Sequence, residues 1–555
     1  MTDALSAATP DSATLVSPHD RPLPLLSVET LRTLERDAAA TLPPHTLMAR
    51  AGRAAARFLA EQIAHDGSVD AAHPVWIVAG PGNNGGDALV VATVLHRAGI
   101  AVEVCMPSDV KPDDAQWALA EAVSAGVSIV TTAPETFDDH GWLVDGMFGI
   151  GLTRPLDGVF ATLAGRMAVR ARTHGRVLAL DVPSGLDSDT GNVVDQGAAV
   201  RATHTVTFIG AKPGLFMASG RDLAGTVTVA PIGLGAGEQV DVGNTDHADD
   251  DAAASTTAAA TTGATLIARA ATLSAPGLFA THFPPRDFST NKGSFGSLAV
   301  VGGATGMCGA PILAARAALY TGAGKVHVAL LGAGAPPYDP PHPELMLHHV
   351  DDVPLATMDA LSIGCGMGHE DRATRVLHDA LALDIPKLLD ADALNLIAND
   401  ASLAAQVKAR GEQGDPCVLT PHPLEAARLL GVDTKTVQRD RIAAARDLAT
   451  RYASVVVLKG TGTIVAAPDG RLAINPTGNA ALATGGTGDV LGGIIGALMA
   501  QRVPRYEAAL AGVYLHGLAA DALTAQGDGP AGLTAGELAP MVRRLLNRLF
   551  YPIRH

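Results

Sequence analysis

The stretch Leu482–Gly493, LATGGTGDVLGG, combines five glycines with one carboxylate, Asp489, and an apolar run with helical spacing follows it. Glycines let backbone N–H groups approach an anion closely, and the N-terminus of a helix adds partial positive charge there. An acid in such a loop would repel phosphate. Asp489 is therefore better suited to take a proton from a hydroxyl while the N–H groups stabilise negative charge. Alone, the stretch also fits a glycine-rich turn before a core helix.

The composition of the 555-residue chain predicts about two to four globular domains. Hydrophobic residues make up 47% and aromatic residues only 4%, which predicts cores of small aliphatic side chains. The formal net charge of −16 argues against nucleic acid or an anionic membrane surface as a partner. The four cysteines form no CxxC pair, which favours free thiols in a reducing cytoplasm. No apolar run reaches about 18 residues, so we expect no transmembrane helix.

The first half of the chain reads as a series of strands, polar loops and helices. A buried strand at 75–79 runs into the loop GPGNNGGD at 80–87, and a helix at 88–98 and a strand at 101–106 follow. This is a βαβ unit whose loop has the G-x-G-x-x-G spacing of a nucleotide-binding turn, a signal that is unspecific alone.

Polar residues follow several of the predicted strands of the first half. Asp145 and Asp181 each end a strand, and parallel strands place such residues at one shared crevice. Oxygen atoms of Asn84, Asp145 and Ser184 would suit a hard cation. The alternative is that the aspartates only cap the segments that follow them. Lys212, after a strand at 203–209, is either a charged catalytic group or a surface lysine.

Two segments lack the pattern of a folded core. Residues 234–263 hold six acids, no lysine or arginine, and runs of alanine and threonine, which predicts a flexible linker over 234–272. Residues 1–22 have neither the basic start nor the apolar segment of a signal peptide, and we expect a disordered tail.

The second half, from residue 273, repeats the order of strand, polar loop and helix, which predicts an α/β domain with a mainly parallel sheet. The loops begin near residues 302, 364, 390, 420 and 459. His422 lies between two prolines and is either a rigid turn residue or a ligand contact. Lys459 could bind a nucleotide phosphate or lie at the tip of a hairpin.

Taken together, these motifs resemble those of the bifunctional NAD(P)H-hydrate repair enzymes, from about residue 23 to the end. In the first half the resemblance rests on GPGNNGGD, DGMFGIGLTRPLDG (145–158) and DVPSGLDSDTG (181–191). In the second half it rests on NKGSFG (291–296), GMCGAPILAARAAL (306–319), LDADALN (389–395), LTPHPLEAARLLG (419–431), VLKGTGT (457–463) and NPTGNAALATGGTGD (475–489).

The resemblance implies an α/β fold of two doubly wound domains with mainly parallel sheets and helices on both faces. An NAD(P)H-hydrate epimerase domain over 23–233 would be a Rossmann-like three-layer sandwich. An ADP-dependent NAD(P)H-hydrate dehydratase domain over 273–555 would be ribokinase-like.

The resemblance also implies the residues of both sites. Contacts to the hydrated nucleotide in the epimerase would come from Asn83, Asn84, Gly85, Gly86, Asp87, Gly149, Ile150, Gly151, Leu152, Thr153, Arg154, Pro155 and Asp181. Potassium would be held by Asn84, Asp145 and Ser184. In the dehydratase, the hydrate would contact Ala310, Gly366, His422 and Asp489, and the adenine nucleotide would contact Lys459, Gly460, Thr461, Gly462, Thr463 and Gly488.

The function that this implies is repair of hydrated NADH and NADPH. The first domain would interconvert the R and S hydrates, with Asp181 and Lys212 as candidate acid–base groups. The second would dehydrate the S form at the expense of ADP or ATP, with Asp489 as the base and Mg²⁺ as the metal. We expect a cytoplasmic homo-oligomer. The alternatives are a vitamin or sugar kinase fused to a nucleotide-binding module, or a first half without catalytic activity.

Overall fold

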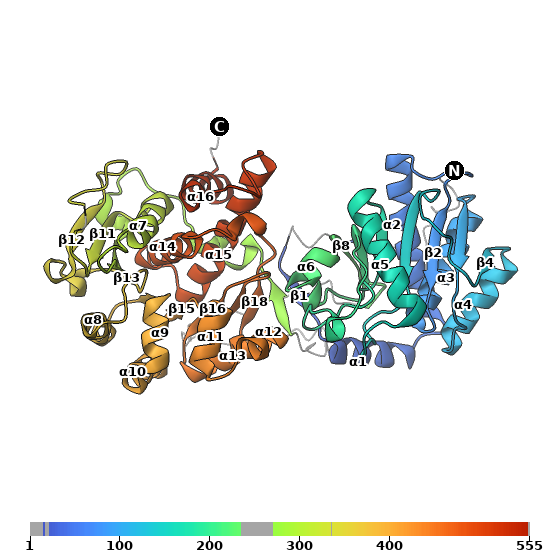
Figure 1. Ribbon diagram of the computed structural model, residues 1–555, viewed down its shortest axis with the longest axis horizontal. Coiled ribbons are helices and arrows are strands. Elements are labelled where there is room, and N and C mark those ends of the chain that lie inside the picture. Colours follow the sequence, from blue (N-terminus) through green and yellow to red (C-terminus); the bar gives the residue numbers. More distant parts are fainter. Residues whose placement is uncertain (1–14, 17–20, 235–269, 335, 553–555) are drawn as a thin grey trace, which may run out of the picture.

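The computed structural model describes residues 15–16, 21–234, 270–334 and 336–552. These residues form two α/β units side by side, each built on its own sheet (Figure 1). The expected tail over 1–22 and linker over 234–272 lie largely outside the described residues. Within them, Val16 forms an antiparallel bridge with Val229, and residues 271–273 form a strand rather than linker.

The first unit contains a seven-stranded sheet in the order β4-β3-β2-β5-β6-β7-β8, with every neighbouring pair parallel. The strands are β2 (Val75–Ala79), β3 (Val102–Cys105), β4 (Ser128–Val130), β5 (Trp142–Gly146), β6 (Val177–Leu180), β7 (His204–Phe208) and β8 (Thr226–Ala230). The helices are α1 (Val28–Ala39), α2 (Thr46–Asp66), α3 (Asn83–Arg97), α4 (Asp113–Ser124), α5 (Gly158–Thr173) and the short α6 (Gly220–Leu223). Helices α1 to α4 cover one face and α5 covers the other, so the unit has three layers.

The second unit contains an eleven-stranded sheet in the order β1-β9-β18-β17-β16-β15-β14-β13-β10-β11-β12. Its strands are β1 (Leu23–Leu25), β9 (Ala271–Leu273), β10 (Ser297–Gly302), β11 (Lys325–Leu330), β12 (Met346–His349), β13 (Ala360–Ile363), β14 (Lys387–Leu389), β15 (Val418–Leu419), β16 (Val455–Leu458), β17 (Ile464–Ala466) and β18 (Leu472–Ile474). From β12 to β16 all pairs are parallel, whereas β16, β17 and β18 pair antiparallel.

Helices cover both faces of the second sheet. They are α7 (Gly309–Thr321), α8 (Asp371–Ala382), α9 (Asp392–Asn399), α10 (Ala401–Glu412), α11 (Pro423–Leu430), α12 (Thr434–Arg439), α13 (Arg441–Arg451), α14 (Thr487–Ala500), α15 (Arg505–Ala525) and α16 (Ala535–Phe550). The expected α/β class, with mainly parallel sheets and helices on both faces, is confirmed.

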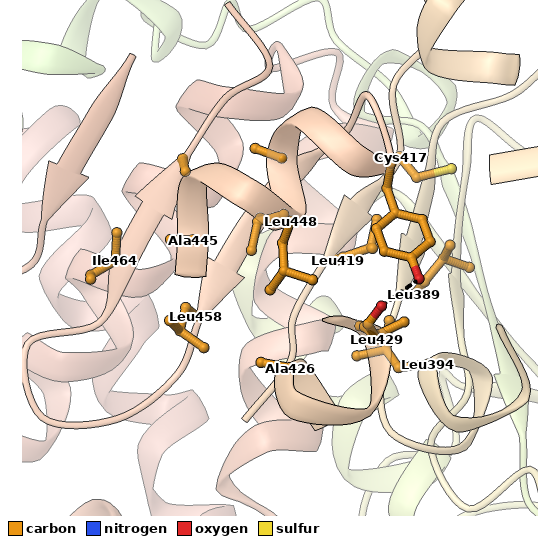
Figure 2. Close-up of a cluster of buried hydrophobic side chains, with 14 of the residues drawn as sticks. Leu389, Leu394, Cys417, Leu419, Ala426, Leu429, Ala445, Leu448, Leu458 and Ile464 are labelled. Atoms are coloured by element: carbon orange, nitrogen blue, oxygen red, sulfur yellow. Dashed lines mark hydrogen bonds between the residues drawn. The ribbon is translucent and has the colours of Figure 1, made fainter. Parts of the chain in front are cut away.

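Successive strand residues contribute to the two cores on opposite faces of the second sheet. Leu388 packs with α7, α14, α15 and α16, while its neighbour Leu389 packs with α8 to α13, as the two-residue period of a strand requires. Figure 2 shows part of the second cluster, where Leu389, Leu419 and Leu458 face Leu429 and Leu448. Small and aliphatic side chains dominate this cluster, as the composition predicts.

Strand β1 lies in the sheet of the second unit, whereas the sequence predicts that the first domain begins at residue 23. It pairs antiparallel with β9 at the edge of the second sheet, although α1, which follows it, packs on the first sheet. The pairing satisfies backbone groups of β9 that an edge strand would leave open. Leu25 also bridges to Ala211 of the first unit. The first strand of the chain therefore ties the two units together.

Helix α15 is the one helix among the described residues that is long and apolar enough to cross a membrane. Arg505–Ala525 has 21 residues, and an 18-residue window within it has a mean hydropathy of 1.2. However, 72% of this 18-residue stretch of α15 is buried inside the protein, where the helix packs against α14 and α16. A buried core helix meets the same criterion, so the helix is weak evidence for a membrane span.

We predict that Leu25→Ala destabilises the protein through the second sheet. The fully buried Leu25 side chain packs in the core that joins the two units, and such truncations cost about 2–5 kcal/mol. The midpoint of urea unfolding should fall. In the control Val123→Ala, where the side chain is 62% exposed, the midpoint should stay within error. Equal midpoints for both variants would contradict the assigned role of β1.

Candidate functional site

The first candidate site is a cavity of about 680 Å³ at the carboxyl ends of β2, β5, β6 and β7. The strand order reverses between β2 and β5, and ligands of doubly wound sheets bind at such a point. Among its lining residues are these predicted ones: Asn83, Asn84, Asp87, Gly149, Ile150, Gly151, Leu152, Asp181 and Lys212. The predicted residues Gly85, Gly86, Thr153, Arg154 and Pro155 do not line it.

Asp181 and Lys212 form a buried ion pair at the base of this cavity. Lys212 Nζ lies 2.6 Å from Asp181 Oδ1 and also donates to Thr207 Oγ1 and the Phe208 carbonyl, each at 2.8 Å. Lys212 is only 1% exposed, which excludes the alternative of a surface lysine. Asp181 has a φ of 68°, a conformation that non-glycine residues rarely adopt outside functional or strained sites.

Behind the cavity, Asp145 and Ser184 form a second buried polar cluster. The Ser184 hydroxyl donates to Asp145 Oδ1 at 2.6 Å, and the Ser184 N–H donates to Asp145 Oδ2 at 2.8 Å. Burial raises the pKa of Asp145 to about 6, although both hydrogen bonds from Ser184 oppose the rise. The side-chain amide of Asn84 is buried, and neither its oxygen nor its nitrogen has a hydrogen-bond partner.

Several lining residues of the first cavity come from α1 and were missed from the sequence. They include Arg32, Glu35 and Arg36, which only the packing of α1 over the strand ends brings to the cavity. Loss of solvation, and next the charge of Asp181, raise the pKa of Glu35. The same two causes raise the pKa of Asp87 well above its usual value. The cavity thus holds an ion-paired carboxylate beside two carboxyls whose pKa values are raised.

The second candidate site lies at the N-terminus of α14, where the glycine loop meets the carboxyl ends of β13 to β16. Gly486 precedes the helix with a φ of 89°, and Asp489 lies in the first helical turn. Burial and the nearby carboxylate of Asp390 raise the pKa of Asp489 to about 6, and Lys459 partly offsets them. The free N–H groups of the first turn can bind an anion, while Asp489 can accept a proton near neutral pH.

Lys459 links three segments of this second site, which are the loop after β14, helix α11 and the glycine loop. Its Nζ lies 2.7 Å from Asp390 Oδ1 and 3.9 Å from Glu425 Oε2. Burial alone would lower the pKa of Lys459. The carboxylates of Asp390 and Glu425 outweigh burial and raise this pKa. A Cβ atom added at Gly488 would lie 3.7 Å from Lys459 Nζ, so the lysine reaches the glycine loop. Lys459 therefore lies in the loop of the β16–β17 hairpin and is also a site residue.

His422, Gly366 and Ala310 are further predicted residues of the second half. His422 caps α11, and its Nδ1 accepts hydrogen bonds from the N–H groups of Leu424 and Glu425. Burial and then Lys459 lower the pKa of His422, so a neutral ring with Nε2–H is favoured. A Cβ atom built on Gly366 would lie 3.5 Å from the Ala310 Cβ atom, so these two residues adjoin.

Arg441 and His516 belong to the second site and were not found from the sequence. The Arg441 guanidinium, 3% exposed, donates to the carbonyls of Leu458, Lys459, Thr461 and Gly462. It thereby fixes the shape of the Lys459–Thr463 loop. His516 is buried in α15, with no partner for its Nε2, and burial lowers its pKa to about 4. No local pattern marks either residue, because Arg441 bonds to carbonyls elsewhere in the chain and His516 contacts the backbone of Thr487 in the glycine loop.

Comparison with known proteins gives matches for both halves. Residues 44–214 match the family described as YjeF-related protein N-terminus, and residues 298–542 match the NAD(P)H-hydrate dehydratase family. The bifunctional NAD(P)H-hydrate repair enzyme of Coxiella burnetii is 38% identical over 527 residues, which cover 93% of this chain and 98% of that protein. The ADP-dependent (S)-NAD(P)H-hydrate dehydratase of Neisseria meningitidis is 48% identical over 48% of this chain and 90% of its own length.

Among solved structures, the ADP/ATP-dependent NAD(P)H-hydrate dehydratase of Bacillus subtilis, co-crystallised with ATP and Mg²⁺, is 31% identical. The similarity covers 49% of this chain and 96% of that one, with a TM-score of 0.42.

We predict that Lys212→Met destabilises the first unit, because it leaves the Asp181 carboxylate buried without its cation. Breaking a buried ion pair in this way costs about 3–5 kcal/mol. Urea unfolding followed by tryptophan fluorescence should show the loss. Lys111→Met at an exposed position should show none, and Asp181→Asn combined with Lys212→Met should recover part of it. An unchanged midpoint for Lys212→Met would contradict a buried charge pair.

Proposed function

The chain belongs to the bifunctional NAD(P)H-hydrate repair enzymes, and from this premise we infer that it restores NADH and NADPH from their hydrated forms. We propose that the first unit interconverts the R and S hydrates. We propose that the second dehydrates the S hydrate with an adenine nucleotide. The observation that carries the proposal is the match with a bifunctional relative along 93% of the chain, which includes both candidate sites.

The same match argues against the two alternatives. A kinase fused to an unrelated module would match such relatives in its second half only, whereas here both halves match. A non-catalytic first half would have no need of a buried Lys212–Asp181 pair that lines a cavity. The preference for ADP is proposed from the Neisseria meningitidis relative, whose name specifies that nucleotide.

In the second unit, the hydroxyl of the hydrated ring is a poor leaving group and must be activated. We propose that this hydroxyl oxygen attacks the terminal phosphorus of the nucleotide while Asp489 takes its proton. The bond from phosphorus to the departing nucleotide breaks, which gives AMP when ADP is the donor. The N–H groups of residues 485–488 and Lys459 would stabilise the charge on the transferred phosphoryl group.

The phosphorylated intermediate then loses inorganic phosphate. The lone pair of the ring nitrogen drives cleavage of the carbon–oxygen bond, and loss of a proton from the adjacent carbon restores the double bond. This order of events explains why a dehydration consumes a nucleotide. It also explains why the glycine loop resembles that of a kinase.

In the first unit, inversion at the carbon that bears the hydroxyl requires proton transfer, by ring opening or by transient loss of the hydroxyl. We propose that Asp181 is the acid–base group and that Lys212 holds it in place at 2.6 Å. Asn83, Asn84, Asp87 and the loop over 149–152 line the same cavity and would contact the hydrate. Among the predicted contacts, Gly85 and Gly86 lie in the first turn of α3 and would act by allowing close packing against Gly80 and Met48. Residues 153–155 would act through the shape of their loop.

We propose that potassium binds beside Asn84, Asp145 and Ser184. The side-chain oxygen of Asn84 is buried without a partner, and Asp145 is buried without a cation, so the donor set fits a monovalent cation. When bound, the ion would supply positive charge to the strand ends.

Mg²⁺ would be held mainly by the nucleotide phosphates, since the described residues contain no group of three or more His, Cys, Asp or Glu suited to a metal.

The four free cysteines, three of them buried, support the proposed cytoplasmic location. The homo-oligomeric state stays a prediction.

We predict that Asp489→Asn abolishes dehydration, because the amide cannot accept the proton of the hydroxyl. Incubation of the full chain with mixed hydrate epimers and ADP should restore the absorbance of reduced nicotinamide. The variant should lose at least about a hundredfold of that rate while still binding ADP. In the unaltered chain, the rate should fall as pH drops below about 6, because protonated Asp489 cannot act as a base. Near-normal turnover by Asp489→Asn would refute the assignment.

We predict that Asp181→Ala abolishes conversion of the R to the S hydrate and leaves dehydration of the S form intact. Chromatographic separation of the two epimers over time measures the first activity, and the absorbance assay measures the second. Asp181→Asn, which keeps a polar group against Lys212, serves as the control for folding. If both variants still interconvert the epimers, Asp181 has a structural role only.

A further inference from the structure

The segment that follows Lys212 runs from the first cavity to the boundary between the two units. It passes through the 3₁₀ turn η2 (Pro213–Phe216) to α6, and Figure 1 shows α6 on the side of the first unit that faces the second. Phe216 and Met217 are buried in the same apolar cluster as Leu458 and Ile464 of the second unit. This segment therefore belongs to an apolar core that it shares with the strands that flank the Lys459–Thr463 loop.

Met217 and Ala218 contact the loop through backbone atoms. The Ala218 N–H donates to the Thr461 carbonyl at 3.1 Å, the same carbonyl that accepts from Arg441. Ala218 has a φ of 47°, which few residues other than glycine adopt. A Cβ atom on Gly462 would lie 2.3 Å from the Phe216 carbonyl oxygen and 2.5 Å from Met217 Cβ. The first unit thus leaves room only for glycine at this point of the loop.

Arg221 of α6 contacts a second segment of the dehydratase half. Its guanidinium donates to the Pro476 carbonyl and, at 2.8 Å, to the Gly478 carbonyl. The chain continues from Gly478 to the glycine loop before α14. Asn475 N–H in turn donates to the Thr463 carbonyl at 2.9 Å, which joins this segment to the Lys459–Thr463 loop. One short segment of the first unit, residues 217–221, therefore contacts both loops.

We propose that residues 217–221 of the first unit are a positioning element of the second unit's reaction, with Arg221 as its principal side chain. The element holds the two nucleotide-facing loops of the dehydratase half in the conformation that binds the adenine nucleotide. This inference rests on the proposed function for the identity of that ligand. Arg221 touches neither substrate and acts only through the backbone of residues 476–478.

The physical reason lies in the cost of ordering the loops. A loop that must be ordered on binding lowers the apparent affinity, because part of the interaction energy is spent on ordering. The chemical step depends instead on Asp489 and Lys459. The contacts of Lys459 to Asp390 and Glu425 lie within the second unit. Loss of Arg221 should therefore change nucleotide binding more than the rate at saturation.

The test is Arg221→Met in the full chain. Calorimetric titration with ADP, without hydrate, should show about tenfold weaker binding, and the KM for ADP should rise in parallel while kcat stays within about twofold. Arg221→Lys, which can donate to one of the two carbonyls, should give an intermediate value. It provides the same readout if the methionine variant does not fold. Epimer interconversion should be unchanged in both.

Two controls separate this effect from general damage to the boundary. Arg201→Met removes the same charge beside the same helix, where Arg201 donates to the Asp222 carbonyl within the first unit. Asn192→Ala removes two other hydrogen bonds between the units, to the carbonyls of Gln438 and Arg439. Both should bind ADP like the unaltered chain.

Unchanged ADP binding in Arg221→Met, or an equal loss in either control, would overturn the proposal. If the unaltered chain binds ADP but does not turn over the hydrate, the proposed function fails while the positioning role is still decided by titration.

Discussion

Each of the two sites depends on a lysine and an aspartate that are removed from water together. Lys212 and Asp181 lie 2.6 Å apart in the first unit, and Lys459 and Asp390 lie 2.7 Å apart in the second. A buried ion pair adds little to stability by itself, but the loss of one partner leaves an uncompensated charge. Both pairs form only when the parallel strands are in register, because the two partners follow different strands. These are the adjacent strands β6 and β7 for the first pair, and β14 and β16, which β15 separates, for the second. The chemistry of both sites therefore requires the complete sheet.

The pairs also separate the roles of the remaining carboxyl groups. Lys459 is occupied by Asp390, so Asp489 lies in the same site without a direct cation, and its pKa is raised to about 6. In the first cavity, Lys212 is occupied by Asp181, while the pKa values of Glu35 and Asp87 are raised. Carboxyl groups with raised pKa values are better suited to exchange protons with a substrate near neutral pH.

The sequence predicted the strand ends well because their signal is local. A buried apolar run followed by glycine or a polar residue located Asp145, Asp181 and Lys459 correctly at the carboxyl ends of strands. It did not predict that β1 pairs with β9, because an antiparallel edge pair between distant segments leaves no local pattern. For the same reason it did not find Arg441, whose hydrogen bonds go to carbonyls that every residue carries.

The scarcity of aromatic residues has a structural counterpart at the boundaries between elements. A Cβ atom on Gly493 of α14 would lie 1.9 Å from the Ala314 carbonyl oxygen of α7, so these helices pack backbone to backbone. The same close approach occurs between the units, where Gly462 meets Phe216 and Met217. Contacts of this kind leave little freedom for adjustment, since packed interiors transmit displacement rather than absorb it. Fusion of the two units thus makes the epimerase half part of the scaffold of the dehydratase half, in addition to supplying its substrate.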